Sequence, residues 1–129
     1  MKLKLNQKQL KTKQLIEQLS SIVGLDPTWA NAIALTESSL GLNLESPTHC
    51  KGVFGMSSIA MKDLLQSMTT NKVVGTLCGI AFLCLLLERW KTIEKASNHF
   101  CDPKDLSFYF DKVKLYMKQL EGLNNDKLV

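Results

Sequence analysis

A long apolar segment constrains the fold of this chain more than any other feature. Residues 72–90 have the length of one helix, and residues 80–87 read I-A-F-L-C-L-L-L without a charge. A helix that is apolar around its whole circumference is normally the core of a soluble protein or a membrane span. The apolar run at residues 76–87 is shorter than the roughly 20 residues that a bilayer requires. The segment therefore predicts a buried core helix and no membrane span.

The segments around this helix also read as helices. Apolar residues at helical spacing predict a helix over residues 7–23, with Gly24 as its C-cap. Asp26 and Pro27 then start a second apolar helix that ends near residues 39–41. Further helices are expected over residues 58–65, over residues 91–100, and from about residue 105 to a stop at Gly122.

These elements predict the fold class and the domain organisation. A chain of 129 residues is long enough for one domain with a substantial core. We expect a single, compact, mainly α-helical domain over residues 1–129, with frayed ends at residues 1–6 and 124–129. A loop or small hairpin follows the second helix.

The charge and the metal-binding residue types exclude several classes of function. A net charge of +4, with lysines near both ends, is typical of solvated helix faces, although it also suits an anionic cell surface or nucleic acid. Zinc spacings and RNP-type aromatics are absent, so no nucleic-acid partner is expected. The four cysteines form no C-x-x-C pair, and the two histidines have no partners at metal-ligand spacing. We expect no metal and no cofactor.

A carboxylate stands in an unfavourable place at the end of the second helix. Residues 33–39 read I-A-L-T-E-S-S, which puts Glu37 in the last helical turn. The helix dipole disfavours an anion there, and local rules tend to be broken at functional sites. The alternatives are that a nearby lysine pairs with Glu37, or that Glu37 is one of the many exposed glutamates found at helix ends. The pattern makes Glu37 a candidate catalytic acid.

A glycine-rich turn follows fifteen residues after Glu37. Residues 52–58 read G-V-F-G-M-S-S, with Gly52 and Gly55 at its two corners. Glycine lets a backbone come close to a ligand such as a sugar chain. A plain tight turn accounts for the pattern equally well.

Together these two stretches resemble the lytic transglycosylase branch of the lysozyme-like superfamily. That family has an apolar helix ending in Glu-Ser, a variable loop, and a Gly-x-x-Gly-(Leu/Met)-x-Gln turn. The matching residues are Glu37-Ser38, Ser46-Pro47, Gly52, Gly55 and Met56. Later blocks are also similar in order: Asn71 with residues 79–83, Ala96-Ser97-Asn98, and residues 109–113. The resemblance covers residues 25–120.

The chain departs from the family pattern at three places. Its loop between the two halves of the motif is about three residues longer than usual. Ser58 stands where the family has glutamine, and Ser97 where it has tyrosine. These replacements bear on sugar binding and on how the reacting group is handled.

The resemblance implies a peptidoglycan-cleaving muramidase that acts on the MurNAc–GlcNAc β-1,4 bond. Such cleavage requires an acid still protonated near neutral pH, and an apolar surrounding provides this by disfavouring the ionised form. Glu37 would protonate the leaving oxygen and then act as the base that draws the sugar's 6-hydroxyl onto the anomeric carbon. The product is a 1,6-anhydro sugar. A hydrolytic lysozyme would need a second carboxylate, and Glu45 is the nearest candidate.

Substrate-binding residues follow from the same resemblance and from side-chain chemistry. Ser38 either orients Glu37 or caps its own helix. Phe54 and Tyr109 could stack on sugar rings, although aromatics at such spacing are more often core. Asn98 is a candidate donor to an N-acetyl or peptide group. The candidate set is Ser38, Gly52, Phe54, Gly55, Met56, Ser58, Asn98 and Tyr109.

The setting is inferred from what the chain lacks. The amino terminus has lysines but no apolar signal-peptide region. We expect synthesis in a host cytoplasm and action on the cell wall, as a bacteriophage lysis protein released through a holin or as a virion component. The expected partners are peptidoglycan glycan strands and other virion proteins. The rival interpretations are a non-catalytic virion protein with the same fold and a helical nucleic-acid-binding regulator.

Overall fold

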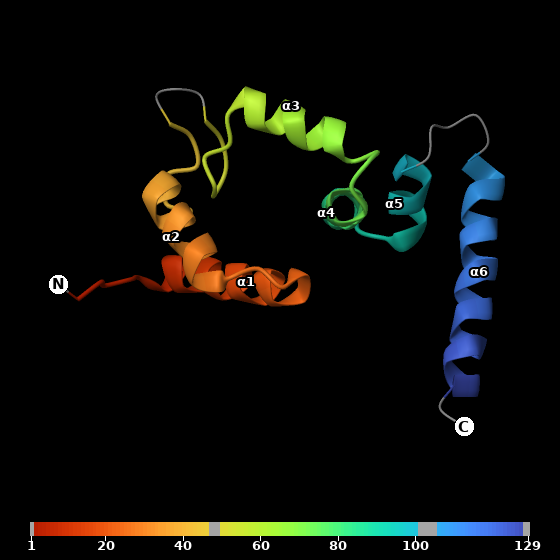
Figure 1. Cartoon of the computed structure of the whole chain (residues 1–129). Helices are drawn as coiled ribbons and strands as arrows, with labels where there is room; N and C mark the ends of the chain where they lie inside the picture. The colour runs from red at the N-terminus through yellow and green to blue at the C-terminus, as the bar shows by residue number, and fades with distance from the viewer. Residues whose placement is uncertain (1, 47–49, 101–105, 128–129) are drawn as a thin grey trace. The chain divides into compact units, whose positions relative to one another are not determined.

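The computed structural model describes residues 2–46, 50–100 and 106–127, and in this part of the chain it contains helices and no β-strand. The mainly α-helical fold class is therefore confirmed. The chain divides into two compact units, Met1–Val74 and Gly75–Val129. Figure 1 labels the helices of both units. They are α1 (Gln7–Val23), α2 (Pro27–Ser38), α3 (Ser58–Ser67), α4 (Lys72–Trp90), α5 (Ile93–Phe100) and α6 (Leu106–Lys127).

Helix α1 has the bounds predicted from the sequence, because both of its ends are capped locally. Asn6 and Gln9 form a capping box: the Asn6 side chain accepts from the Gln9 N–H at 2.8 Å, and Gln9 Oε1 accepts from the Asn6 N–H at 3.0 Å. Gly24 has a left-handed conformation at the other end. The Leu25 N–H donates to the Ser20 carbonyl at 2.9 Å, which completes a Schellman motif.

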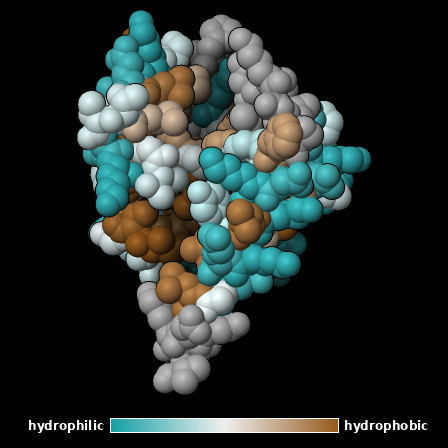
Figure 2. Space-filling model, turned by 90° about the vertical axis from the view of Figure 1, so that its right-hand side faces the viewer, coloured by the Kyte–Doolittle hydropathy of each residue, from teal (hydrophilic) through white to brown (hydrophobic). Residues whose placement is uncertain are grey.

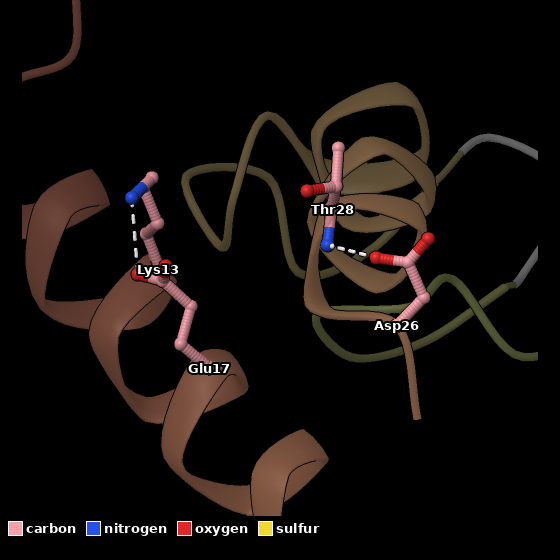
Figure 3. A network of polar contacts seen from close by, with 4 residues as sticks. All are labelled: Lys13, Glu17, Asp26 and Thr28. Carbon is pink, nitrogen blue, oxygen red and sulfur yellow. Dashed lines mark hydrogen bonds and ion pairs between the residues drawn. The ribbon is translucent and has the colours of Figure 1, made fainter. Parts of the chain in front are cut away.

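Helix α2 starts as predicted and ends at Ser38. The Asp26 carboxylate accepts from the Thr28 N–H at 3.0 Å, and Pro27 occupies the first helical turn. Figure 3 shows this cap beside the Lys13–Glu17 ion pair of α1, which joins Lys13 Nζ to Glu17 Oε1 at 3.0 Å. The pair is one helical turn apart and half-exposed, so it contributes a few tenths of a kcal/mol, about 0.3–0.5.

The core of the first unit lies where α1 and α2 pack together. Ile16, Ala30, Ala34 and Leu40 are buried, and the half-buried Leu5, Leu35 and Val53 pack against them. The alanines of α2 have small side chains, so the two backbones can come close.

The face of α1 that packs on this core differs from the expected one. The buried residues of α1 are Gln9, Ile16 and Ser20. The other large apolar residues that give α1 its helical spacing are exposed, namely Leu10, Leu15, Leu19, Ile22 and Val23. Gln9 is buried although it is polar, because its Nε2 donates to the Ser39 carbonyl at 3.0 Å.

A loop with two isolated antiparallel bridges connects α2 to α3. Lys51 is bridged to both Glu45 and Met56. The Lys51 N–H donates to the Met56 carbonyl at 2.9 Å, and the reverse bond is 2.8 Å long. The loop therefore folds back on itself at residues 52–55. Pro47, which belongs to the resemblance, lies outside the described residues.

Helix α3 is capped by Ser57, whose hydroxyl accepts from the Ala60 N–H at 3.1 Å. The helix ends at Ser67, two residues later than expected, and none of its residues is buried.

Helix α4 has its predicted bounds, but the prediction of a buried core helix is wrong for this structure. Leu86 is its one buried residue. Large apolar side chains of α4 are exposed. On the face of the molecule that Figure 2 draws, hydrophobic surface lies between hydrophilic groups. The reason is the size of the second unit, because few elements are available there to surround a helix that is apolar on all sides.

The length and composition of α4 also bear on membranes. Within the described residues it is the one helix long enough and apolar enough to cross a bilayer by these two criteria. The core helix of a soluble protein meets the same criteria. The absence of a membrane span remains a prediction.

Aromatic contacts link α4 to α5 in the second unit. The Phe82 and Phe100 ring centroids lie 5.8 Å apart at 43°. Trp90 and His99 are stacked, with centroids 3.6 Å apart and planes 7° from parallel. Lys91 ends α4 in a left-handed conformation, and Thr92 caps α5 through the Lys95 N–H.

Helix α6 contacts α5 and continues beyond its expected stop. It runs through Gly122 to Lys127. A glycine inside a helix costs only about 1 kcal/mol, so it does not have to end one. The expected break between the last two helices, at residues 101–105, lies outside the described residues.

Candidate functional site

Glu37 occupies the last turn of α2, as predicted, with its side chain exposed to solvent. Within the described part of the chain no ion pair involves Glu37. A neutralising lysine partner is therefore not observed there, whereas the exposure agrees with the other alternative, an ordinary glutamate at a helix end. An unpaired carboxylate remains at a helix end whose dipole disfavours it.

The glycine turn lies directly against this carboxylate. A methyl group at Gly55 would be 2.9 Å from Glu37 Oε2 and 3.0 Å from Glu37 Cβ. Real Cβ atoms essentially never come so close to another heavy atom. Gly55 also has a φ of 57°, which a residue with a side chain adopts at a cost. The two halves of the sequence motif are thus adjacent in space, and glycine is the residue that permits the contact.

Ser38 connects α2 to the same turn from the inside. Its side chain is 1% exposed. The hydroxyl lies 2.5 Å from the Val53 carbonyl oxygen and 3.1 Å from that of Ala34, and its one proton serves one acceptor at a time. The Gly41 N–H donates to the same hydroxyl at 2.9 Å. Ser38 therefore faces the protein interior and holds residue 53 against the end of α2.

Three consecutive residues with positive φ follow Ser38. The φ angles of Ser39, Leu40 and Gly41 are 52°, 55° and 87°. The Leu40 side chain is 2% exposed in the core, and its N–H donates to the Ala34 carbonyl at 3.1 Å. Gln9 Nε2 donates to the Ser39 carbonyl at 3.0 Å. This left-handed turn reverses the chain immediately after the candidate acid.

An apolar hollow lies on the first unit close to Glu37 in sequence. It has a volume of about 250 Å³ and is lined by Leu25, Trp29, Ala30, Ile33 and Phe54. Ile33 precedes Glu37 by one helical turn, and Phe54 precedes Gly55. Phe54 lines this hollow and is 40% exposed, and its predicted role in substrate binding stays a prediction.

The other predicted residues of the first unit surround the turn without contacting Glu37 in any recorded bond. Gly52 has a positive φ, and its N–H donates to the Leu44 carbonyl at 2.8 Å. Met56 is half-buried and pairs with Lys51 through its backbone. Ser58 is exposed at the first position of α3.

Two predicted residues belong to the second unit. Asn98 lies on α5, where its Oδ1 is shielded from solvent and has no hydrogen-bond partner among the described residues. Tyr109 lies on α6 and is half-buried. Ser97, which stands at the family's tyrosine position, donates to the Ile93 carbonyl at 2.7 Å.

The second carboxylate of the hydrolytic alternative lies on the loop. Glu45 is exposed and its backbone is bridged to Lys51. Among the described residues no group of three His, Cys, Asp or Glu side chains could hold a metal ion.

Sequence reasoning did not identify Gln9, the left-handed turn or the Val53 carbonyl as parts of this region. Asn6 and Gln9 have the spacing of a capping box, which is visible in the sequence. That spacing does not reveal the second bond of Gln9, because Ser39 is thirty residues away.

Comparison with known proteins adds no relative: no family model, curated protein or solved structure matches this chain. The chemistry of the site therefore has to be argued from its own residues. An exposed, unpaired carboxylate beside the glycine backbone of Gly55 can exchange a proton with a bound polar ligand. The apolar hollow of the same unit, which Glu37 does not line, offers a surface for the apolar face of a ligand.

Proposed function

We propose that this protein is a peptidoglycan lytic transglycosylase with a lysozyme-like fold, in which Glu37 is the single general acid and base. The observation that carries the proposal is the contact between Glu37 and Gly55. Two short stretches that resemble separate parts of the transglycosylase motif meet at one place, and the missing side chain of Gly55 is what lets them meet.

The proposed reaction needs one group that acts first as a general acid and then as a general base. Glu37 first donates its proton to the glycosidic oxygen between MurNAc and GlcNAc. The resulting carboxylate then removes the proton of the sugar's 6-hydroxyl, whose oxygen bonds to the anomeric carbon. The products are a free GlcNAc end and a 1,6-anhydroMurNAc end, and no water is consumed.

Glu37 is exposed in the free protein, so in this proposal the apolar surrounding expected for the acid has to come from the bound substrate. A glycan strand laid over the turn would exclude water from the carboxyl group, which strengthens the electrostatic interactions there. The hollow beside Phe54 offers an apolar surface for the face of a sugar ring. We assign substrate contact to Phe54 and to the backbone of residues 52–56. Ser38 does not contact the substrate in this proposal; its hydroxyl holds the Val53 carbonyl in place.

The proposed setting is a bacteriophage that uses the enzyme at entry or at lysis. The net charge of +4 favours an anionic cell envelope. The partners in this proposal are glycan strands and, in a virion, neighbouring structural proteins.

Digestion of purified peptidoglycan tests the proposal. The wild-type protein should release muropeptides that end in 1,6-anhydroMurNAc, each lighter by one water than the hydrolysis product. Reducing ends would instead indicate a hydrolytic lysozyme with a second carboxylate, for which Glu45→Gln is the diagnostic variant. No cleavage by folded protein would favour a structural virion protein and would overturn the proposal.

A further inference from the structure

We propose that Gln9 of α1 is a positioning residue for Glu37, acting through the left-handed turn at residues 39–41. This inference rests on the proposed function, because it concerns how the candidate acid is held in place. Gln9 is 9% exposed, and both ends of its amide are engaged. Oε1 accepts from the Asn6 N–H at 3.0 Å, and Nε2 donates to the Ser39 carbonyl at 3.0 Å.

The turn requires outside support because of its backbone conformation. Ser39 and Leu40 carry side chains yet have φ angles of 52° and 55°. L-residues are disfavoured in this region and persist there only where the surrounding structure over-determines them. Without its restraints the chain after Glu37 would relax toward a more extended path.

Residues of helix α1 contact the turn at residues 39–41 and supply this support. Gln9 forms the side-chain hydrogen bond that reaches the turn from another helix. One helical turn further along α1, Thr12 packs under Gly41, where an added methyl group would come within 3.3 Å of Thr12 Oγ1. The face of α1 that unexpectedly carries polar residues is therefore the face on which the turn rests.

The turn is connected to Glu37 by a continuous set of bonds. Ser39 follows Glu37 by two residues, and the Gly41 N–H donates to the Ser38 hydroxyl. That hydroxyl also contacts the Val53 carbonyl, at the start of the backbone that lies on Glu37. Displacing Ser39 therefore displaces Ser38 and separates Glu37 from Gly55. A catalytic group misplaced by about 1 Å can lose on the order of 100-fold in rate.

Two variants separate positioning from simple stability. Gln9→Glu keeps the shape and the Oε1 acceptor, but replaces the donor to Ser39 with an oxygen that repels the carbonyl. Asn6→Ala is the matched control. It removes the side-chain cap of α1, at a cost of about 1 kcal/mol, and leaves both Gln9 side-chain bonds, because Gln9 Oε1 is bound to the Asn6 backbone. Gln9→Met replaces Gln9→Glu if the latter does not fold.

The test combines muropeptide release, at temperatures well below each variant's Tm, with the NMR cross-relaxation between Glu37 side-chain protons and Gly55 α-protons. For Gln9→Glu we expect kcat to fall roughly 10- to 100-fold, KM to change little and the cross-relaxation to weaken. Asn6→Ala should have the kcat, the KM and the cross-relaxation of the wild type. The kcat of Gln9→Glu relative to wild type should recover as pH falls toward about 4.3, because the introduced carboxyl can then donate to Ser39.

The outcomes distinguish this inference from the function on which it rests. An inactive wild-type protein overturns the proposed function, and the cross-relaxation then tests Gln9 alone. Equal kcat for Gln9→Glu and Asn6→Ala in an active enzyme overturns the positioning role. Unchanged cross-relaxation in Gln9→Glu overturns it whether or not the wild type cleaves peptidoglycan.

Discussion

Gly55 lies against the side chain of Glu37 so closely that a methyl group on it would be 2.9 Å from Glu37 Oε2. The contact joins the end of α2 to a loop residue eighteen positions later in the chain. A glycine suits this corner because a side chain would be strained at this positive φ and would come within 3.0 Å of Glu37 Cβ. It also gives the candidate acid a fixed neighbour made of backbone alone.

Gly55→Ala should impair the site more than it impairs the fold. The new methyl group must displace the Glu37 side chain, so we expect turnover of peptidoglycan to fall at least about tenfold. Gly24→Ala is the matched control, because Gly24 also has a positive φ of 73° and nothing lies within 4 Å of its added methyl. Both variants should lose about 1 kcal/mol in urea unfolding from backbone strain. Equal turnover of the two variants would show that the Glu37–Gly55 contact has no role in catalysis.

Ser38→Ala should destabilise the first unit. Removing the hydroxyl leaves the half-buried Val53 carbonyl and the buried Gly41 N–H without their partner. Such a loss costs about 1–3 kcal/mol, which urea unfolding measures as a lower transition midpoint. Ser67→Ala removes a comparable bond, from Ser67 Oγ to the Asp63 carbonyl one turn earlier, but without a tertiary partner. Ser67→Ala should change the free energy of unfolding by less than about 0.5 kcal/mol. If Ser38→Ala costs no more than Ser67→Ala, Ser38 does not hold Val53 against the end of α2.

The Trp90–His99 stack should contribute to the stability of the second unit. A double-mutant cycle with Trp90→Leu and His99→Ala isolates the pair from the loss of each side chain alone. Stacked aromatic pairs are worth about 0.5–1.5 kcal/mol beyond area burial, so we expect a coupling energy in that range from thermal unfolding. A coupling near zero would mean that the rings are adjacent without stabilising each other.

The helices of this chain could be predicted because their end signals are local. The Asn6 cap, Gly24, the Asp26–Pro27 pair and Ser57 each act on backbone groups within a few residues. Gly122 misled the prediction, because a glycine near an expected helix end resembles a stop signal whether or not the helix continues past it.

Burial was less predictable than helicity. The leucines of α1 have helical spacing, yet the residues that this helix buries are Gln9, Ile16 and Ser20. Gln9 meets a backbone acceptor, the Ser39 carbonyl, which lies thirty residues away in the sequence. Hydrophobicity alone does not reveal such a partner.

The candidate site was predictable only in its two separate halves. Glu37 and the glycine turn were identified from residue types and from resemblance, but their contact depends on the path of the chain between them. That path begins with positive φ angles at Ser39 and Leu40, where no glycine signals a reversal. The bonds that hold it come from Gln9 and Ser38, thirty and fifteen residues from their partners.

The central claim is that Glu37 is the acid and base of a transglycosylation, and one comparison tests it most directly. Wild-type protein and Glu37→Gln, shown to be equally folded, are incubated with the same peptidoglycan, and the released muropeptides are analysed by mass. The wild type should yield 1,6-anhydroMurNAc ends. The Gln variant should release them roughly 100- to 10,000-fold more slowly, because it cannot transfer the proton. Equal release by the two proteins would contradict the assignment of Glu37.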